Sequence, residues 1–131
     1  QHREVFAAFL TAGTRQLLEA GADLPPDERS HFTQGLQAAV ERQLAEQAAF
    51  WAGRERWIDA ATRALDLAAL HDGELRLVDG TLVVDDPEVL EGLCACVDEM
   101  DAVRAEEVAL MQARAARVAA GMTRLADPSA G

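Results

Sequence analysis

The sequence feature that most limits the fold is the pair Asp79-Gly80, which lies between two short aliphatic runs. Asp-Gly is a preferred pair for a two-residue type I′ turn, because both central residues of that turn need positive φ. We therefore predict a β-hairpin at about 74–85. Pairing across this turn places four aliphatic side chains on one face: Leu75, Leu77, Leu82 and Val84. A lone two-stranded hairpin is marginal in water, so this face must be covered by helices or by a second copy.

Helical periodicity fills the chain on both sides of this hairpin. Apolar residues recur every three or four positions over about 2–21, 26–71 and 87–126, which is the spacing of amphipathic helices. Pro25-Pro26 and Asp86-Pro87 lie where these residues favour a helix start. Gly53 allows a bend or a break in the second helix, because glycine costs roughly 1 kcal/mol against alanine inside a helix. Residues 127–131 form a tail.

These elements predict a mainly α protein with a single helical domain over 1–131. It is a three-helix bundle whose two long antiparallel helices are joined by the short β-hairpin. The chain has 27 alanines but two tryptophans and no tyrosine, so we expect helices to approach closely through small side chains. The first helix is too short to cover the long pair, so we also expect a homodimer that forms through helical faces.

Two long stripes indicate which faces take part in that contact. In the second helix a seven-residue repeat runs through Leu44, Trp51, Ile58 and Leu65, as in the seam of a coiled coil or a bundle. In the third helix a stripe runs to Leu125 and includes Arg104, which either extends its charge outward along the seam or pairs with a carboxylate and fixes register. The interface candidates are Leu44, Trp51, Trp57, Ile58, Leu65, Leu75, Leu77, Leu82, Val84, Met100, Arg104, Met111, Val118 and Met122.

Charge and hydropathy exclude two classes of partner. The net charge is -11 and the basic residues are scattered, whereas nucleic-acid binding needs a concentrated basic face. No apolar run is long enough for a transmembrane helix, so we expect no membrane partner either. The acidic residues around 98–107 are expected to form a solvated face.

The two cysteines favour a reducing compartment. Cys94 and Cys96 are two residues apart in a helical segment, so their side chains point about 200° apart and cannot join each other or share one metal. We expect reduced thiols. The first residues also lack the charged-then-apolar pattern of a secretory signal, so the predicted location is the cytoplasm.

Residues with catalytic or metal-binding chemistry are few and isolated. Glu28 and His31 have the Glu-x-x-His spacing of di-iron bundles, but no second copy of that motif exists. His71 lies beside Asp72 and Glu74 without a nucleophile, so we expect it to pair with carbonyls at the end of the second helix. We therefore predict no catalytic residue, no metal, no cofactor and no enzymatic activity.

The leading functional hypothesis is a non-enzymatic interaction or assembly module that acts through long helical faces. Its partner is a second copy, or another protein with a basic or apolar helical surface. One alternative is a small-molecule or metal sensor with a pocket near Trp51 and Trp57. A further alternative, on size and charge alone, is an acidic secretion-type chaperone or an inhibitor of a basic protein.

Overall fold

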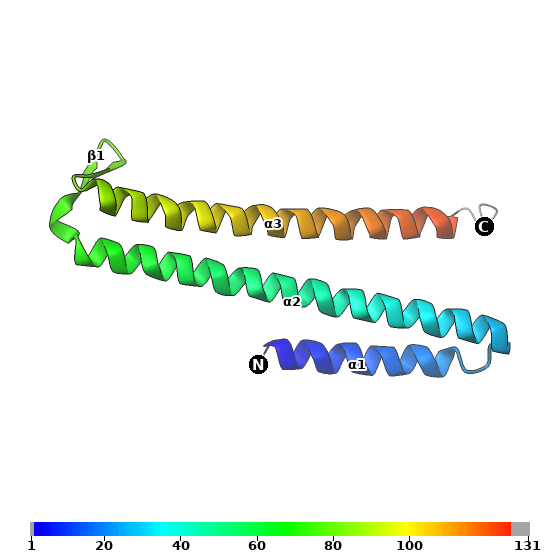
Figure 1. Cartoon of the computed structure of the whole chain (residues 1–131). Coiled ribbons are helices and arrows are strands. Elements are labelled where there is room, and N and C mark those ends of the chain that lie inside the picture. Colours follow the sequence, from blue (N-terminus) through cyan, green and yellow to red (C-terminus); the bar gives the residue numbers. More distant parts are fainter. Residues whose placement is uncertain (1, 127–131) are drawn as a thin grey trace. The chain divides into compact units, whose positions relative to one another are not determined.

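The fold is the predicted set of three helices with a β-hairpin between the two long ones (Figure 1). The computed structural model describes residues 2–126, without the side chains of His2 and Leu125. The elements in order are α1 (His2–Ala20), α2 (Pro26–Leu70), a 3₁₀ turn (Asp72–Glu74), β1 (Leu75–Val78), β2 (Thr81–Val84) and α3 (Pro87–Ala126). The predicted tail at 127–131 lies outside the described residues.

The chain forms two compact units, and the boundary between them falls inside α2. Unit 1 is Gln1–Ala48 and unit 2 is Ala49–Gly131. The single domain expected from the chain length stays a prediction. Each unit is an antiparallel arrangement of helical segments, and the hairpin belongs to unit 2.

In unit 1, the turn between α1 and α2 is closed by backbone hydrogen bonds and by one close contact. The Gly21 amide donates to the Leu17 carbonyl at 3.0 Å, and the Arg29 amide donates to the Pro25 carbonyl at 2.8 Å. Gly21 ends α1 as expected, but it does not adopt positive φ. A Cβ at this position would lie 2.6 Å from Cε1 of Phe32, so glycine is needed here for space.

The hairpin of unit 2 has the predicted register and turn. Leu75 pairs with Val84 and Leu77 with Leu82. Asp79 and Gly80 have φ of 50° and 78°, so both residues take the left-handed conformation that a type I′ turn requires. The Asp86 side chain then accepts a hydrogen bond of 2.8 Å from the Glu88 amide, which caps the start of α3.

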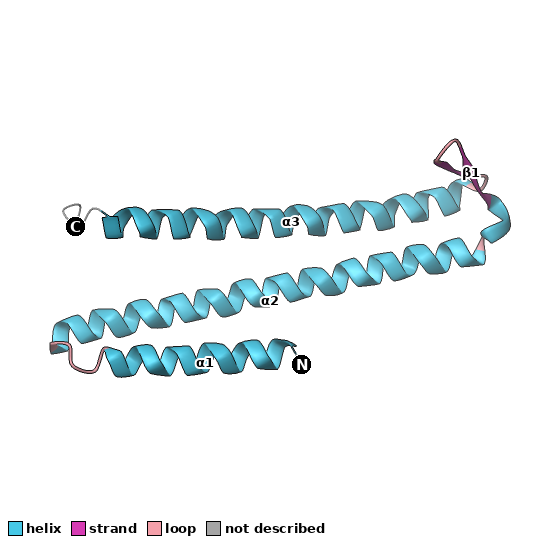
Figure 2. Ribbon diagram, turned by 180° about the vertical axis from the view of Figure 1, so that it is seen from behind, coloured by secondary structure: helices cyan, strands magenta, loops and turns pink. Residues whose placement is uncertain are grey.

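The helix α2 is continuous through Gly53 (Figure 2), so the break allowed at that position does not occur. Gly53 is buried, and a Cβ there would lie 3.4 Å from Cγ1 of Val103 on α3. The glycine therefore gives α3 room to approach α2. The free-energy cost of one glycine inside a helix is small compared with the stabilisation that the other residues of this 45-residue helix contribute.

Residues spaced by seven on α2 and on α3 face each other, and we call these residues the inner seam. Ala60 and Val103 are fully buried, and Val89 and Cys96 are buried nearly as well. A Cβ on Gly92 would lie 2.8 Å from Cδ2 of Leu67. The inner seam consists of Gly53, Ala60 and Leu67 on α2 and Val89, Cys96 and Val103 on α3.

The seam predicted from the largest apolar residues is not the one that joins α2 to α3. Ile58 and Leu65 each follow an inner-seam residue by five positions, which is about 140° around the helix. They are 56% and 72% exposed. The buried positions between the two helices are instead Gly53 and Ala60 on α2 and Val89, Cys96 and Val103 on α3.

Candidate interaction surface

One side of the α2–α3 pair in unit 2 is lined by ion pairs. Arg56 donates to Glu99 at 2.8 Å and to Glu106 at 2.9 Å. Hydrogen bonding to Glu99, and next to Glu106, raises the pKa of the Arg56 guanidinium above its usual value. The expectation of a purely solvated acidic face is therefore wrong for these two carboxylates, which lie beside α2 and are held by its arginine.

The opposite side of the pair contains a third ion pair, next to aromatic rings. Arg54 donates through Nε and Nη2 to the two carboxylate oxygens of Glu107, and the Glu107 side chain is only 17% exposed. The Arg54 guanidinium also lies 5.7 Å from the ring centre of Phe50 and 6.0 Å from that of Trp57. Glu107 is thus a third carboxylate of the acidic run that is bound by α2.

These contacts establish which residues share a side of the helix pair. Arg56 follows Gly53 by three positions, and its partner Glu106 follows Val103 by three positions. Arg54 follows Gly53 by one position, and its partner Glu107 follows Val103 by four. Successive residues of a helix are turned by about 100°. On each helix, a residue that follows an inner-seam residue by three positions therefore lies on one side of the pair. A residue that follows it by one, four or five positions lies on the other side. We call these the ion-paired side and the apolar side.

Most of the large apolar residues of unit 2 gather on the apolar side, and most are exposed. From α2 they include Trp57, Ile58 and Leu65. From α3 they include Leu90, Val97, Val108, Met111, Val118 and Met122, of which Met111 is 71% exposed. Trp51 and Met100 are half-buried. The sequence-predicted interface candidates that α2 and α3 contribute to unit 2 thus lie on one side of the helix pair, whereas Leu44 belongs to unit 1.

The far part of α3 extends beyond the residues that unit 2 contributes from α2. The Arg54–Glu107 ion pair marks where the two helices are side by side. Unit 2 begins only five residues before Arg54 on α2, whereas α3 continues for nineteen described residues after Glu107. Val108, Met111, Val118 and Met122 belong to this extension. Their exposure leaves a long apolar stripe uncovered.

Surface area supports the same conclusion. The chain exposes 10017 Å². By the usual scaling, two separate compact bodies of the sizes of units 1 and 2 would expose about 8,000 Å² together. The excess of about 2,000 Å² therefore belongs to the units themselves and does not depend on how they lie relative to each other.

The apolar face of the hairpin is covered only at its base. Leu75 and Val84, next to the helices, are half-buried. Leu77 and Leu82, next to the turn, are 75% and 51% exposed. Arg76 on the other face binds Asp85 at 2.5 Å, which ties the two strands together. The tip of the hairpin therefore adds to the uncovered apolar surface.

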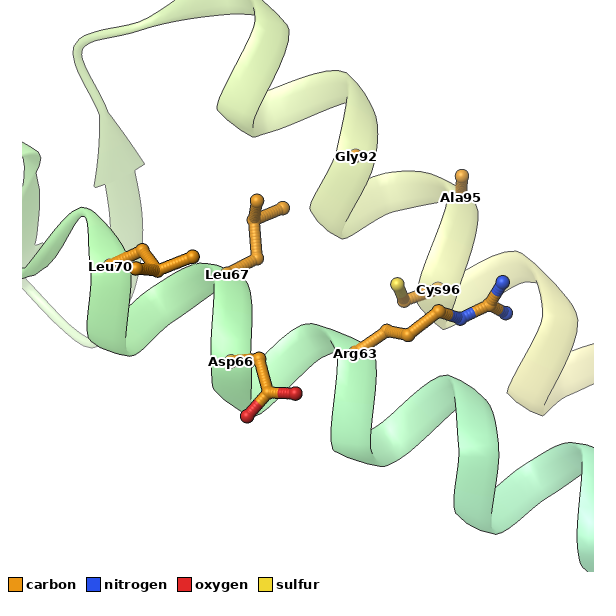
Figure 3. Close-up of a pocket in the computed structure, with 7 residues that line it drawn as sticks. All are labelled: Arg63, Asp66, Leu67, Leu70, Gly92, Ala95 and Cys96. Carbon is orange, nitrogen blue, oxygen red and sulfur yellow. The ribbon is translucent and has the colours of Figure 1, made fainter.

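Three open grooves lie on the described surface. The first has a volume of about 430 Å³ and lies between α2 and α3 near the hairpin (Figure 3). Its lining is Arg63, Asp66, Leu67, Leu70, Gly92, Ala95 and Cys96. The second lies beside Arg56 and Glu99, and the third lies in unit 1 between α1 and α2, where Leu44 contributes to the wall. None of these three grooves is lined by Trp51 or Trp57.

The histidines make local contacts. Nδ1 of His71 lies 3.3 Å from Oε2 of Glu74, an ion pair when the imidazole is protonated, so its partner is this carboxylate and not the helix-end carbonyls that we expected. Nδ1 of His31 lies 2.9 Å from the Asp27 carbonyl one turn earlier in α2. Among the described residues, no three potential ligands come together at a point that would hold a metal ion.

Arg104 is exposed and makes no ion pair within residues 2–126. Its neighbour Val103 occupies the buried position, which neither interpretation of Arg104 anticipated. Both cysteines are free thiols, with Cys94 exposed and Cys96 buried in the inner seam.

Sequence reasoning missed the inner seam because it ranked positions by hydrophobic size. The signal was present as a second seven-residue repeat, one position before the large stripe of α3, at Val89, Cys96 and Val103. The described helices contain no apolar window of the length needed to cross a bilayer. Comparison with protein-family models, with curated proteins and with solved structures finds no match for this chain.

Proposed function

We propose that this chain is a non-enzymatic interaction or assembly module, and that the apolar side of the α2–α3 pair is its binding surface. The observation that carries this proposal is the segregation of unit 2 into two sides. One side carries the ion pairs of Arg56 with Glu99 and Glu106, and the other presents large apolar side chains such as Leu65 and Met111 to solvent. Soluble monomers rarely expose apolar stripes of this length, and such surfaces mark sites of association.

The chemistry of the surface supports a helical partner. The exposed residues of α3 recur every three or four positions, which is the spacing that packs into the grooves of another helix. The surface is also poor in charge apart from Asp101, Arg104 and the Arg54–Glu107 pair. A partner with an apolar helical face fits it better than a strongly basic one.

The test compares one substitution on each side of α2. Leu65→Glu places a charge on the apolar side, and Thr62→Glu places the same charge on an exposed position of the polar surface. Affinity capture followed by mass spectrometry then identifies what each variant binds, including the chain itself. We expect Thr62→Glu to retain the binding partner of the wild type and Leu65→Glu to lose it, with equal helicity by circular dichroism. Retention by Leu65→Glu would contradict the proposal.

The sensor hypothesis stays an alternative. The groove beside Gly92 supports it, because its lining includes both apolar residues and the charged residues Arg63 and Asp66 (Figure 3). Native mass spectrometry of freshly purified protein tests it through a retained small molecule or metal ion. The hypothesis of a chaperone or inhibitor for a basic protein is supported by the net charge of -11 alone. A cytoplasmic location is proposed from the two free thiols.

A further inference from the structure

The exposed surface of α3 contains a complete heptad pattern with two charged positions. Every seventh residue from Leu90 to Val118 is exposed, and so is every seventh residue from Cys94 to Met122. We call these ten residues the outer stripe: Leu90, Cys94, Val97, Asp101, Arg104, Val108, Met111, Ala115, Val118 and Met122. Eight of them are apolar or weakly polar, and Asp101 and Arg104 have opposite charges at its middle. Neither charged residue makes an ion pair within residues 2–126.

We propose that the outer stripe binds the outer stripe of a second copy of this chain in antiparallel orientation, with Arg104 opposite Asp101 of the second copy. This inference rests on the proposed function and names its partner. A two-fold axis makes the contact reciprocal, so Asp101 also meets Arg104 of the second copy and both charges are neutralised. The same register places Val97 opposite Val108 and Cys94 opposite Met111.

The charges select this register over its neighbours. In an antiparallel coiled coil the pairing shifts in steps of seven residues. A shift of one step in either direction would place Arg104 opposite Cys94 or Val108 of the second copy, leaving a charge against an apolar side chain. A parallel pair would instead bring the two Arg104 side chains together. Only the proposed register satisfies both charged residues.

The size of the uncovered surface fits this occupant. The contact from Leu90 to Ala115 spans about 38 Å at 1.5 Å per residue. A specific interface of standard size buries about 800 Å² on each partner. The axis passes near residues 101–104 of α3, so Trp57 and Ile58, which flank the Arg54–Glu107 contact, lie close to the centre of the dimer.

Disulfide trapping tests the register directly. Met111→Cys places a thiol opposite the natural Cys94 of the second copy, and mild oxidation is expected to convert most of this variant into a covalent dimer. Cys94 and position 111 of the same chain are about 25 Å apart along the helix, so the bond must join two chains. The matched control Gln112→Cys lies about 100° away around the helix and is expected to stay monomeric on a non-reducing gel. Cys94→Ser in the Met111→Cys background is expected to abolish the cross-link.

Charge exchange tests the Asp101–Arg104 pair. By sedimentation equilibrium, we expect the wild type to dimerise at micromolar concentration and Asp101→Arg to weaken the dimer at least tenfold. The double variant Asp101→Arg with Arg104→Asp is expected to restore the wild-type affinity, because the pair is reversed but complementary. Circular dichroism verifies that each variant remains helical.

The outcomes separate this inference from the function on which it rests. A wild type that is monomeric at 100 μM overturns the proposed dimer. The proposed interaction module would still be supported if the wild type bound a different protein and Leu65→Glu did not bind it. A wild-type dimer in which Met111→Cys fails to cross-link, or in which Asp101→Arg has no effect, overturns the register.

Discussion

The two sides of the α2–α3 pair in unit 2 differ in the side chains that they present and in the contacts that these side chains make. On the ion-paired side, Arg56 binds two carboxylates of α3 at the protein surface. On the apolar side, large side chains such as Ile58 and Val97 remain exposed although they share the helices with a buried inner seam. The ion-paired side therefore has polar contacts between the two helices, whereas the apolar side keeps large side chains in solvent. The same substitution made on different surfaces should therefore have different consequences.

The largest contrast is expected between the inner seam and the apolar side. Val103→Ala removes two methyl groups from a fully buried position, so we expect the free energy of unfolding to fall by about 2 kcal/mol at every protein concentration. Val97→Ala makes the identical change at an exposed position. Its effect should be close to zero in dilute solution and should appear only where the chain associates. Urea denaturation at two protein concentrations measures both. Equal losses at low concentration would erase the distinction between the two surfaces.

A smaller contrast is expected between carboxylates of the two sides. Glu107→Gln leaves Arg54 without its charged partner in a half-buried position, and we expect a loss of about 1–2 kcal/mol, reduced by the partial exposure of Arg54. Glu106→Gln changes an exposed pair in which Arg56 keeps Glu99, so the loss should be smaller and should vanish in high salt. Thermal unfolding at low and high ionic strength provides the comparison. A larger effect for Glu106→Gln would show that the ion-paired side is the more tightly coupled one.

The smallest contrast concerns two helical glycines. Gly121→Ala has no atom within 4 Å of the new Cβ, so the gain in helix propensity should raise stability by about 0.5–1 kcal/mol. Gly53→Ala should gain less or nothing, because its Cβ would press on Val103 at 3.4 Å. Melting temperatures of the two variants, measured side by side, decide the point. An equal gain at both positions would mean that the approach of α3 to α2 at Gly53 is looser than the structure indicates.

Local signals determined much of the fold from the sequence. The Asp79-Gly80 pair specified the turn, and its alternating neighbours specified the register of β1 and β2, because strand pairing depends on a few adjacent residues. Prolines and capping residues set the helix starts, as the hydrogen bond to Asp86 illustrates. Helix propensity and hydrophobic period are also local properties. They act along the chain before any tertiary contact forms.

Only the tertiary structure decided which stripe of each helix is covered. Both α2 and α3 carry two seven-residue repeats. In α2 one repeat contains Gly53 and Ala60 and the other contains Ile58 and Leu65, and the sequence ranks the larger residues first by hydrophobicity. The residues that become buried between the two helices are Gly53, Ala60 and Val103. That choice leaves Ile58, Leu65 and Met111 at the surface. Which stripe is covered depends on how the two helices face each other, and no single segment of the sequence encodes that arrangement.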